Sequence, residues 1–345
     1  MARIAQVRGM LLEEALLHLL RSTGYKTVDD VNGDPTLDRS SAGLLVRGRG
    51  TSHQIDAIAD FAVYAPFSHP QRLLVEAKCF EPKKRVDLSI VRGALGTLKD
   101  VQEFWVSLAT GPPKQRYHYQ YAVFSATGYT ENAQSYAFAQ DIYLIPLAES
   151  RFFTPVVTAL RNVSASDPNL AANADLPIPL GELRKVVRSA VRQGQGELVF
   201  AQFEETISGI QEFVAACRRI SFSLLAVLGG RFPVFLVPAP GLSLDEINLD
   251  NSVGIYRGPN DQTWYLRDRN TNRELFSFDL PQELFLEYAD QGMLSAHAAL
   301  ELKQQEMAEF EAVLMRNERP SLVRFRLDFG WLDRVRGRLR AQRLE

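Results

Sequence analysis

The chain has 345 residues, 46% of them hydrophobic and 23% charged, which is the composition of a globular protein and excludes an intrinsically disordered one. Two cysteines are too few for a disulfide framework, and no four-ligand zinc spacing can be drawn from them and the five histidines. The net charge of −2 argues against a protein that holds nucleic acid by overall positive charge, although an acidic enzyme can still bind DNA through a local basic face.

The sequence contains no predicted signal peptide or membrane span. It begins MARIAQVRGM, which lacks the apolar core of a signal peptide. The longest apolar run, 221–240, is interrupted by Gly229, Gly230, Arg231 and Pro233 and is too short to cross a bilayer. We therefore expect a cytoplasmic protein that has no contact with a membrane.

The first half of the chain predicts alternating helices and strands. Leu12, Leu16 and Leu20 recur at helical spacing, which predicts a helix over 9–23 that ends at Gly24. A polar loop is expected at 29–41. The later patterns predict strands at 44–46, 54–64 and 72–77, a helix at 86–106, a strand at 119–125, a helix at 131–140 and a strand at 142–145. This alternation is typical of a mixed α/β domain.

A proline-rich stretch without periodicity suggests where the first domain ends. We predict a first domain at 1–165, a linker at 166–180 and an α+β domain at 181–345. The second domain is expected to hold helices at 183–191 and 199–220, hairpins of 221–228 with 232–237 and of 263–267 with 274–278, and a long helix within 282–316. Its role stays open between specificity, sensing and assembly. Its arginine-rich end fits a second DNA-contacting arm and, equally, a helix with a solvated basic face.

An aspartate and a Glu-Ala-Lys sequence on neighbouring predicted strands carry the candidate chemistry. Apolar and polar residues alternate through 53–61, which predicts a strand with Asp56 on its polar face. Residues two apart on a strand share a face, so Glu76 and Lys78 project together, and Asp56 can reach them if the two strands are antiparallel neighbours. Two carboxylates placed close together repel unless a cation lies between them. Hard oxygen ligands suit Mg²⁺, and we expect Mn²⁺ to substitute for it.

This arrangement suits hydrolysis of a phosphodiester bond. A divalent ion can polarise the phosphate and lower the pKa of a bound water. Lys78 can orient that water or offset negative charge that develops during the reaction. The backbone carbonyl of Ala77 is a further candidate ligand for the ion.

The same residues resemble the PD-(D/E)XK nuclease superfamily and, within it, the Mrr-like restriction endonuclease family. The resemblance is spread over about 9–147. The segment 12–25 resembles the family's first helix, 48–56 its metal-binding aspartate strand, 74–78 its core motif and 128–144 its closing helix and strand. Many Mrr-like members carry glutamine where Glu76 stands, but glutamate is the commoner residue in the superfamily. The proline that the superfamily name pairs with the aspartate is absent here.

The resemblance implies a restriction-endonuclease-like fold, in which a mixed sheet is flanked by helices. It also implies residue roles: Asp56 and Glu76 would bind the metal, Lys78 would assist the nucleophile, and Glu13 would add an acidic group from the first helix. Simpler roles stand beside these. Asp56 fits a turn or cap carboxylate. Glu76 and Lys78 fit an exposed salt bridge on a strand edge, contributing about 0–1 kcal/mol, and Glu13 fits an ordinary amphipathic helix.

Several polar residues near this motif are candidates for binding substrate. His53 fits a phosphate donor or a structural hydrogen bond, and Gln54 fits a site contact or a pair within the sheet. The basic residues that follow the Glu-Ala-Lys strand fit phosphate ligands or a solvated surface: Lys83, Lys84, Arg85 and Arg92.

We therefore expect an endonuclease that cleaves DNA, with restriction or antiviral defence as the role suggested by family analogy. As protein partners, a second copy of the chain and a defence-system protein both remain open. A nuclease for branched or damaged DNA is one alternative. A nuclease fold that serves as a DNA-binding or assembly module without turnover is another, and the intact Asp56, Glu76 and Lys78 argue against it.

Overall fold

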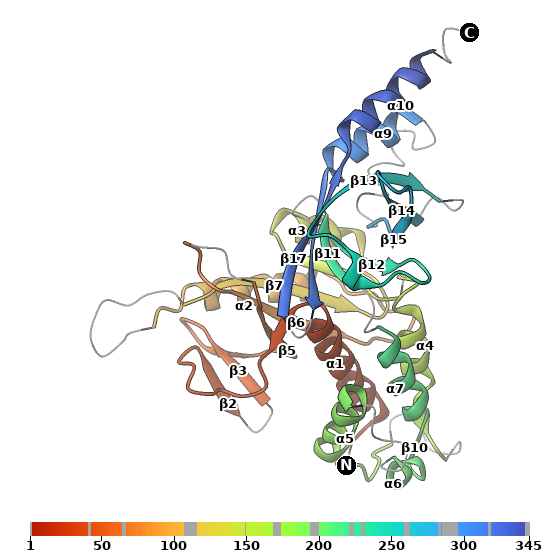
Figure 1. Ribbon diagram of the computed structural model, residues 1–345. Coiled ribbons are helices and arrows are strands. Elements are labelled where there is room, and N and C mark those ends of the chain that lie inside the picture. Colours follow the sequence, from red (N-terminus) through yellow and green to blue (C-terminus); the bar gives the residue numbers. More distant parts are fainter. Residues whose placement is uncertain are drawn as a thin grey trace. The chain divides into compact units, whose positions relative to one another are not determined.

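The computed structural model divides into two compact units, Met1–Ser221 and Phe222–Glu345 (Figure 1). It describes residues 2–40, 43–63, 67–106, 116–148, 150–167, 174–193, 200–220, 224–228, 232–258, 263–281, 284, 296–316 and 319–341. The division lies beyond the linker expected at 166–180. The reason is that helix α5 (Leu180–Gln193), which follows this segment, packs on α1 (Ile4–Ser22) in the first unit.

A five-stranded mixed sheet forms the centre of the first unit. Its strands run in the order β1 (Tyr25–Thr27), β5 (Ala57–Phe61), β6 (Gln71–Lys78), β7 (His118–Ser125) and β8 (Tyr143–Pro146). The first three strands are antiparallel neighbours, whereas β6, β7 and β8 are parallel. The predicted mixed α/β class is confirmed.

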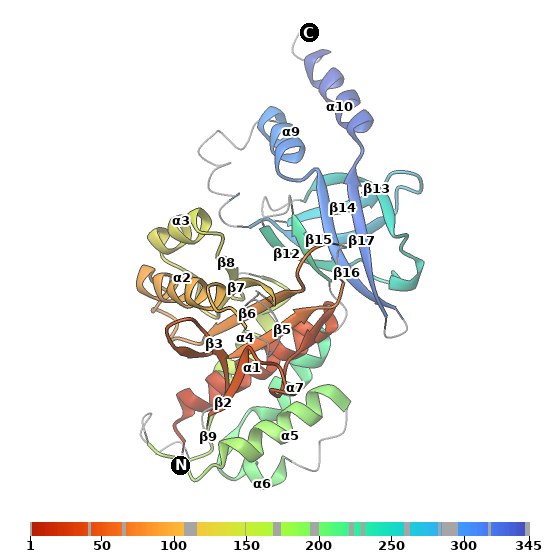
Figure 2. The same cartoon turned by 90° about the vertical axis from the view of Figure 1, so that its left-hand side faces the viewer.

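Helices cover both faces of this sheet. One face carries Leu74 and Val123, which form a core cluster with buried residues of α2 (Leu88–Gln102) and α3 (Glu131–Ala139). Helix α1 contacts β5 and β6, and Figure 2 shows α2 and α3 on the far side of the sheet from it. Helix α2 begins where the side chain of Asp87 accepts hydrogen bonds from two backbone amides of the first turn, a common N-cap.

Two segments before β6 differ from the sequence prediction. The end of the loop expected at 29–41 forms β2 (Leu37–Ser40), which pairs with β3 (Gly43–Arg47) in a separate three-stranded sheet. The strand expected at 54–64 is broken: β4 (Ser52–Gln54) belongs to that second sheet, and β5 begins only at Ala57. The chain therefore passes from one sheet to the other at Ile55 and Asp56.

The rest of the first unit is mainly helical. It contains α4 (Thr154–Asn162), β9 (Ser164–Ala165), α5, α6 (Ala201–Glu204), β10 (Ile207–Ser208) and α7 (Ile210–Arg219). The single helix expected at 199–220 is wrong, because α6 ends at Glu204, strand β10 follows, and Gly209, with a φ of 87°, stands at the start of α7. A Cβ at this position would lie 3.2 Å from the carbonyl oxygen of Asn162, so glycine also permits the close approach of α4.

The second unit contains a closed barrel of strands, and its described residues also form helices. Its seven strands lie in the order β11 (Leu224–Leu228), β12 (Phe232–Pro238), β15 (Glu274–Asp279), β14 (Thr263–Asp268), β13 (Asp250–Arg257), β17 (Arg319–Leu327) and β16 (Glu309–Arg316). A short 3-10 helix, Leu244–Glu246, precedes β13, and the helices are α9 (Ala296–Gln305) and α10 (Phe329–Ala341). Both predicted hairpins are confirmed as antiparallel pairs, and the turn 229–231 lies outside the described residues.

The long helix expected within 282–316 is wrong over its last part. The residues Glu309–Arg316 form strand β16, which pairs with β17, and Phe310, Ala312 and Leu314 lie buried on one of its faces. Apart from Leu284, the segment 282–295 lies outside the described residues. In the described part of the chain, no helix has the length and apolar character that crossing a membrane requires.

Lys303 of α9 is a buried amine beside two tryptophans of the second unit. Its side chain is 8% exposed, and Nζ lies 5.3 Å from the ring centre of Trp264 and 5.5 Å from that of Trp331. Burial, together with the positive charge of Arg257, lowers the pKa of Lys303 to about 8. The folded state therefore disfavours the ammonium form.

We expect Lys303→Met to stabilise the second unit at pH 7. The expected gain in the free energy of unfolding is up to about 3 kcal/mol, because each unit of pKa difference between the folded and unfolded states corresponds to about 1.4 kcal/mol. The loss of the cation–π attraction reduces this gain. The cost of burying the ammonium is full below pH 8 and disappears as the pH rises toward the ordinary lysine value. Urea unfolding followed by tryptophan fluorescence should therefore show wild-type stability approaching that of the variant between pH 8 and 10.5. Equal stability at pH 7 would contradict the assignment.

Candidate active site

Asp56 lies at the bend between β4 and β5, rather than inside a strand as predicted. Its neighbours Ala57, Ile58 and Ala59 are all buried, so both faces of β5 are covered and the strand has no polar face. The backbone N–H of Ala77 donates a hydrogen bond to Oδ2 of Asp56 at 2.8 Å. The antiparallel register of β5 and β6 ends at Ala57 and Val75, directly beside Asp56. Asp56 therefore stands opposite the Glu-Ala-Lys segment.

Glu76 and Lys78 lie on the same face of β6 and form an ion pair. Nζ of Lys78 is 2.5 Å from Oε1 of Glu76, and the two side chains are 25% and 22% exposed. The hydroxyl of Tyr121, on β7, donates to Oε2 of Glu76 at 3.0 Å. Because β6 lies between β5 and β7, this pair is not the exposed salt bridge at a strand edge that the sequence left open.

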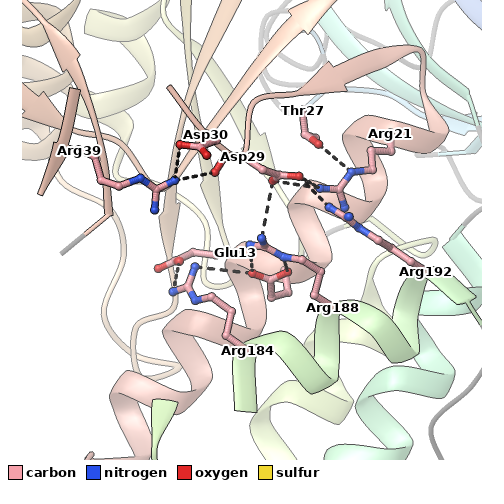
Figure 3. Close-up of polar contacts among 10 residues, drawn as sticks. Glu13, Arg21, Thr27, Asp29, Asp30, Arg39, Arg184, Arg188 and Arg192 are labelled. Atoms are coloured by element: carbon pink, nitrogen blue, oxygen red, sulfur yellow. Dashed lines mark hydrogen bonds and ion pairs between the residues drawn. The ribbon is translucent and has the colours of Figure 1, made fainter. Parts of the chain in front are cut away.

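Glu13 of α1 adds a third carboxylate to this region. The negative charge of Asp56 adds to the cost of ionising Glu13. Nη2 of Arg184, on α5, donates to Oε2 of Glu13 at 2.7 Å (Figure 3). Burial raises the pKa of Glu13, and the positive charge of Arg184 opposes that shift. Glu13 is therefore more than a solvated residue of an amphipathic helix.

Burial is the largest electrostatic cost of ionising the carboxylates of this site. Burial raises the pKa of Asp56, and the charge of Glu76 adds to the shift, while the hydrogen bond from Ala77 and the charge of Lys78 oppose it. Burial and the neighbouring Glu76 also raise the pKa of the Tyr121 hydroxyl well above its usual value. Additional positive charge would stabilise the ionised carboxylates.

Two carboxylates and one backbone carbonyl are the candidate ligands for a divalent ion at this site. Among the residues that the structure describes, no three His, Cys, Asp or Glu side chains lie close enough together to hold a metal. Mg²⁺, however, keeps several waters and takes one or two carboxylates from a protein. The carboxylates of Asp56 and Glu76, with the carbonyl oxygen of Ala77, supply hard oxygen ligands of this kind and fit the ion chemically.

His53 makes the structural hydrogen bond that was one of its two expected roles. Its Nε2 lies 2.7 Å from Oδ2 of Asp100 on α2, and the backbone amides of Gly50 and Thr51 donate to the same carboxylate. Asp100 thereby ties the turn between β3 and β4 to α2. Gln54 pairs with Leu45 within the three-stranded sheet, and its side chain is exposed.

The basic residues predicted to bind substrate are all exposed and follow β6 along the chain. Nζ of Lys84 lies 4.4 Å from the ring centre of Phe80, and the guanidinium of Arg92 lies 5.7 Å from that of Tyr136. Lys83, Lys84, Arg85 and Arg92 are thus open to solvent, and substrate binding by them stays a prediction.

Sequence reasoning missed Tyr121, Arg184 and the role of Asp60. Tyr121 lies in a segment predicted as an apolar strand, and nothing in the sequence marks it as a residue of the site. Arg184 begins a row of arginines spaced four apart on one helix, and this spacing was the signal that could have drawn attention to it. Asp60, which shares the polar positions of the alternating segment 53–61, instead binds the buried guanidinium of Arg72 at 2.6 Å.

Comparisons with known proteins add little to this geometry. No family model matches the chain, and no curated protein matches it. A solved structure titled "Crystal Structure of Protein of Unknown Function AF1548" is similar with a TM-score of 0.31 and 14% sequence identity, covering 61% of this chain and 94% of that chain. A similarity of this size supports no statement about fold or activity.

Proposed function

We propose that this chain is a metal-dependent endonuclease that hydrolyses DNA phosphodiester bonds at Asp56, Glu76 and Lys78. The hydrogen bond from the Ala77 amide to Asp56 carries the proposal, because it holds one carboxylate against the backbone that bears the other. The mixed sheet flanked by helices agrees with a restriction-endonuclease-like fold, which we also propose. A role in restriction or antiviral defence remains a prediction from family analogy.

Each residue has a distinct task in this proposal. Asp56, Glu76 and the carbonyl of Ala77 would hold Mg²⁺ or Mn²⁺. The bound ion supplies a polarised phosphate and an acidified water. Lys78 keeps an ammonium group within hydrogen-bonding distance of Glu76, where it orients the attacking water or offsets charge on the phosphate. Tyr121 fixes the orientation of the Glu76 carboxylate through its hydroxyl.

A cleavage assay on a panel of substrates tests the proposal. The purified full chain is incubated with supercoiled plasmid, branched DNA and RNA, each with Mg²⁺, Mn²⁺ or EDTA. We expect cutting of plasmid DNA with either metal ion and none with EDTA. Lys78→Ala should abolish the activity, whereas Lys99→Ala, on the exposed face of α2, should retain it.

The other outcomes distinguish the alternatives. Cutting confined to branched DNA would identify a junction or repair nuclease with the same chemistry. Binding of DNA without turnover under every metal condition would favour a non-catalytic module. Cleavage of RNA alone, or full activity in Lys78→Ala, would contradict the proposal.

A further inference from the structure

We propose that Arg184 binds a phosphate of the DNA substrate beside Asp56 and Glu13, so that helix α5 contributes a substrate-binding residue to the site. This inference rests on the proposed function. Arg184 belongs neither to the Asp56, Glu76 and Lys78 motif nor to the strands that carry it. It starts from a row of three arginines on α5.

Arg184, Arg188 and Arg192 are spaced four apart and project from one face of α5 toward α1 (Figure 3). Two of them serve the packing of α5. Arg188 donates from Nε and Nη2 to the two oxygens of Glu14 at 2.8 and 2.7 Å, and the side chain of Glu14 is 1% exposed. Arg192 pairs with Asp29 at 2.9 Å, and its side chain is 36% exposed, as is that of Arg184.

Arg184 differs from the other two in its surroundings. Its Nη2 binds Glu13, which belongs to the candidate site, while its Nη1 lies 3.6 Å from Oε1 of Glu14 and shares that carboxylate with Arg188. The positive charge of Arg184 also lowers the electrostatic cost of ionising Asp56. The side chains of Arg184 and Glu13 are 36% and 20% exposed, so this pair is accessible in a way that the carboxylate of Glu14 is not. Arg184 thus presents a cation to solvent at the edge of the acidic site.

The charge balance explains why a nuclease site would need this cation. Glu13, Asp56 and Glu76 place three carboxylates where a DNA phosphate must approach, and Lys78 offsets only part of their charge. A guanidinium matches the geometry of a phosphate and forms two parallel hydrogen bonds with it. The ion pair with Glu13 holds Arg184 in place before substrate arrives, which reduces the entropy lost on binding.

The test measures DNA binding without turnover. Fluorescence anisotropy of a labelled duplex is recorded in EDTA at 50–200 mM KCl for the wild type, Arg184→Ala, Arg184→Lys and the matched control Arg192→Ala. We expect Arg184→Ala to bind about tenfold or more weakly at low salt, and the slope of log K against log salt to become less steep by about 1. Arg184→Lys should keep the slope and lose part of the affinity, because its charge remains but the planar fork does not. Arg192→Ala should bind as the wild type does.

Several results would overturn the inference. Wild-type affinity and salt slope in Arg184→Ala would overturn it while leaving the proposed function intact, provided that the wild type binds and cuts DNA. Equal losses in Arg184→Ala and Arg192→Ala would show a general basic surface and would also overturn it. A wild type that does not bind the duplex in EDTA would overturn this inference, whereas the proposed function is decided separately by the cleavage assay with Mg²⁺ or Mn²⁺. If Arg184→Ala does not fold, Arg184→Gln takes its place, and thermal unfolding of each variant establishes that the fold is kept.

Discussion

Asp56→Asn is expected to abolish DNA cleavage without weakening the fold. The loss of one electrostatic stabiliser of a developing charge typically slows a reaction by about 10²–10³-fold, and Asp56 is in addition a proposed metal ligand. The amide oxygen of asparagine can still accept the hydrogen bond from the Ala77 N–H, so the bend between β4 and β5 should persist. Rates of plasmid cutting with saturating Mg²⁺ give the direct measurement.

Stability should move in the opposite direction from activity. The pKa of Asp56 is raised in the folded state. At a pH above this folded-state pKa the ionised carboxylate therefore lowers the stability of the fold, and at a pH below the pKa of the unfolded state this cost vanishes. Asp56→Asn should therefore unfold at the same or a higher urea concentration at pH 7, and the difference should disappear in acid. Asp175→Asn, at a side chain that is 57% exposed, is the matched control. Cleavage at the wild-type rate in Asp56→Asn would refute the assigned role.

Arg72→Leu is expected to destabilise the first unit by about 3–5 kcal/mol, the usual cost of removing one partner from a buried ion pair. The side chain of Arg72 is 2% exposed, and it binds Asp60 at 2.6 Å and Asp34 at 2.9 Å. Its guanidinium also lies 3.7 Å from the ring centre of Tyr117. Leucine would leave two carboxylates without their cation.

Urea unfolding checks this value against a control pair of the same chemistry. Arg39 lies 2.9 Å from Asp30, and both side chains are more than half exposed. Arg39→Leu should therefore cost about 0–1 kcal/mol, as exposed pairs do. Similar small losses of stability in both variants would contradict the expectation that the buried ion pairs of Arg72 stabilise the fold more than an exposed pair does.

The sequence predicted the elements whose patterns are local. Strands β6 and β7, helices α2 and α3 and both barrel hairpins lie close to their expected ranges. The side-chain period also placed Glu76 and Lys78 on one face. These features depend on neighbouring residues and turns, which periodicity records directly.

The features that periodicity missed depend on contacts between distant segments. Alternation through 53–61 predicted one continuous strand, but the chain changes sheets at Asp56. Both faces of β5 are buried because α1 covers one face of the sheet and α2 the other. Asp60 was expected on a polar face, but its partner Arg72 comes from the next strand. Proximity between Asp56 and Ala77 could be stated only conditionally, because it required the two strands to be antiparallel neighbours.

The domain boundary was obscured for the same reason. Proline-rich residues before α5 suggested a linker, yet Arg184 and Arg188 bind acidic residues of α1 that lie 171 and 174 positions earlier in the chain. Nothing local in the sequence records such a contact. The strand β16 was hidden because its apolar residues follow those of α9 after a short interval, and the two periods merge.

A crystal grown with Mn²⁺ and examined for anomalous scattering tests the shared metal site most directly. We predict one peak between Asp56 and Glu76, with carboxylate oxygens from both residues and the Ala77 carbonyl at about 2.0–2.2 Å, the range for a small divalent ion. No peak at saturating Mn²⁺, or a peak elsewhere with Glu76 still bound to Lys78, would contradict the claim that these two acids share one ion.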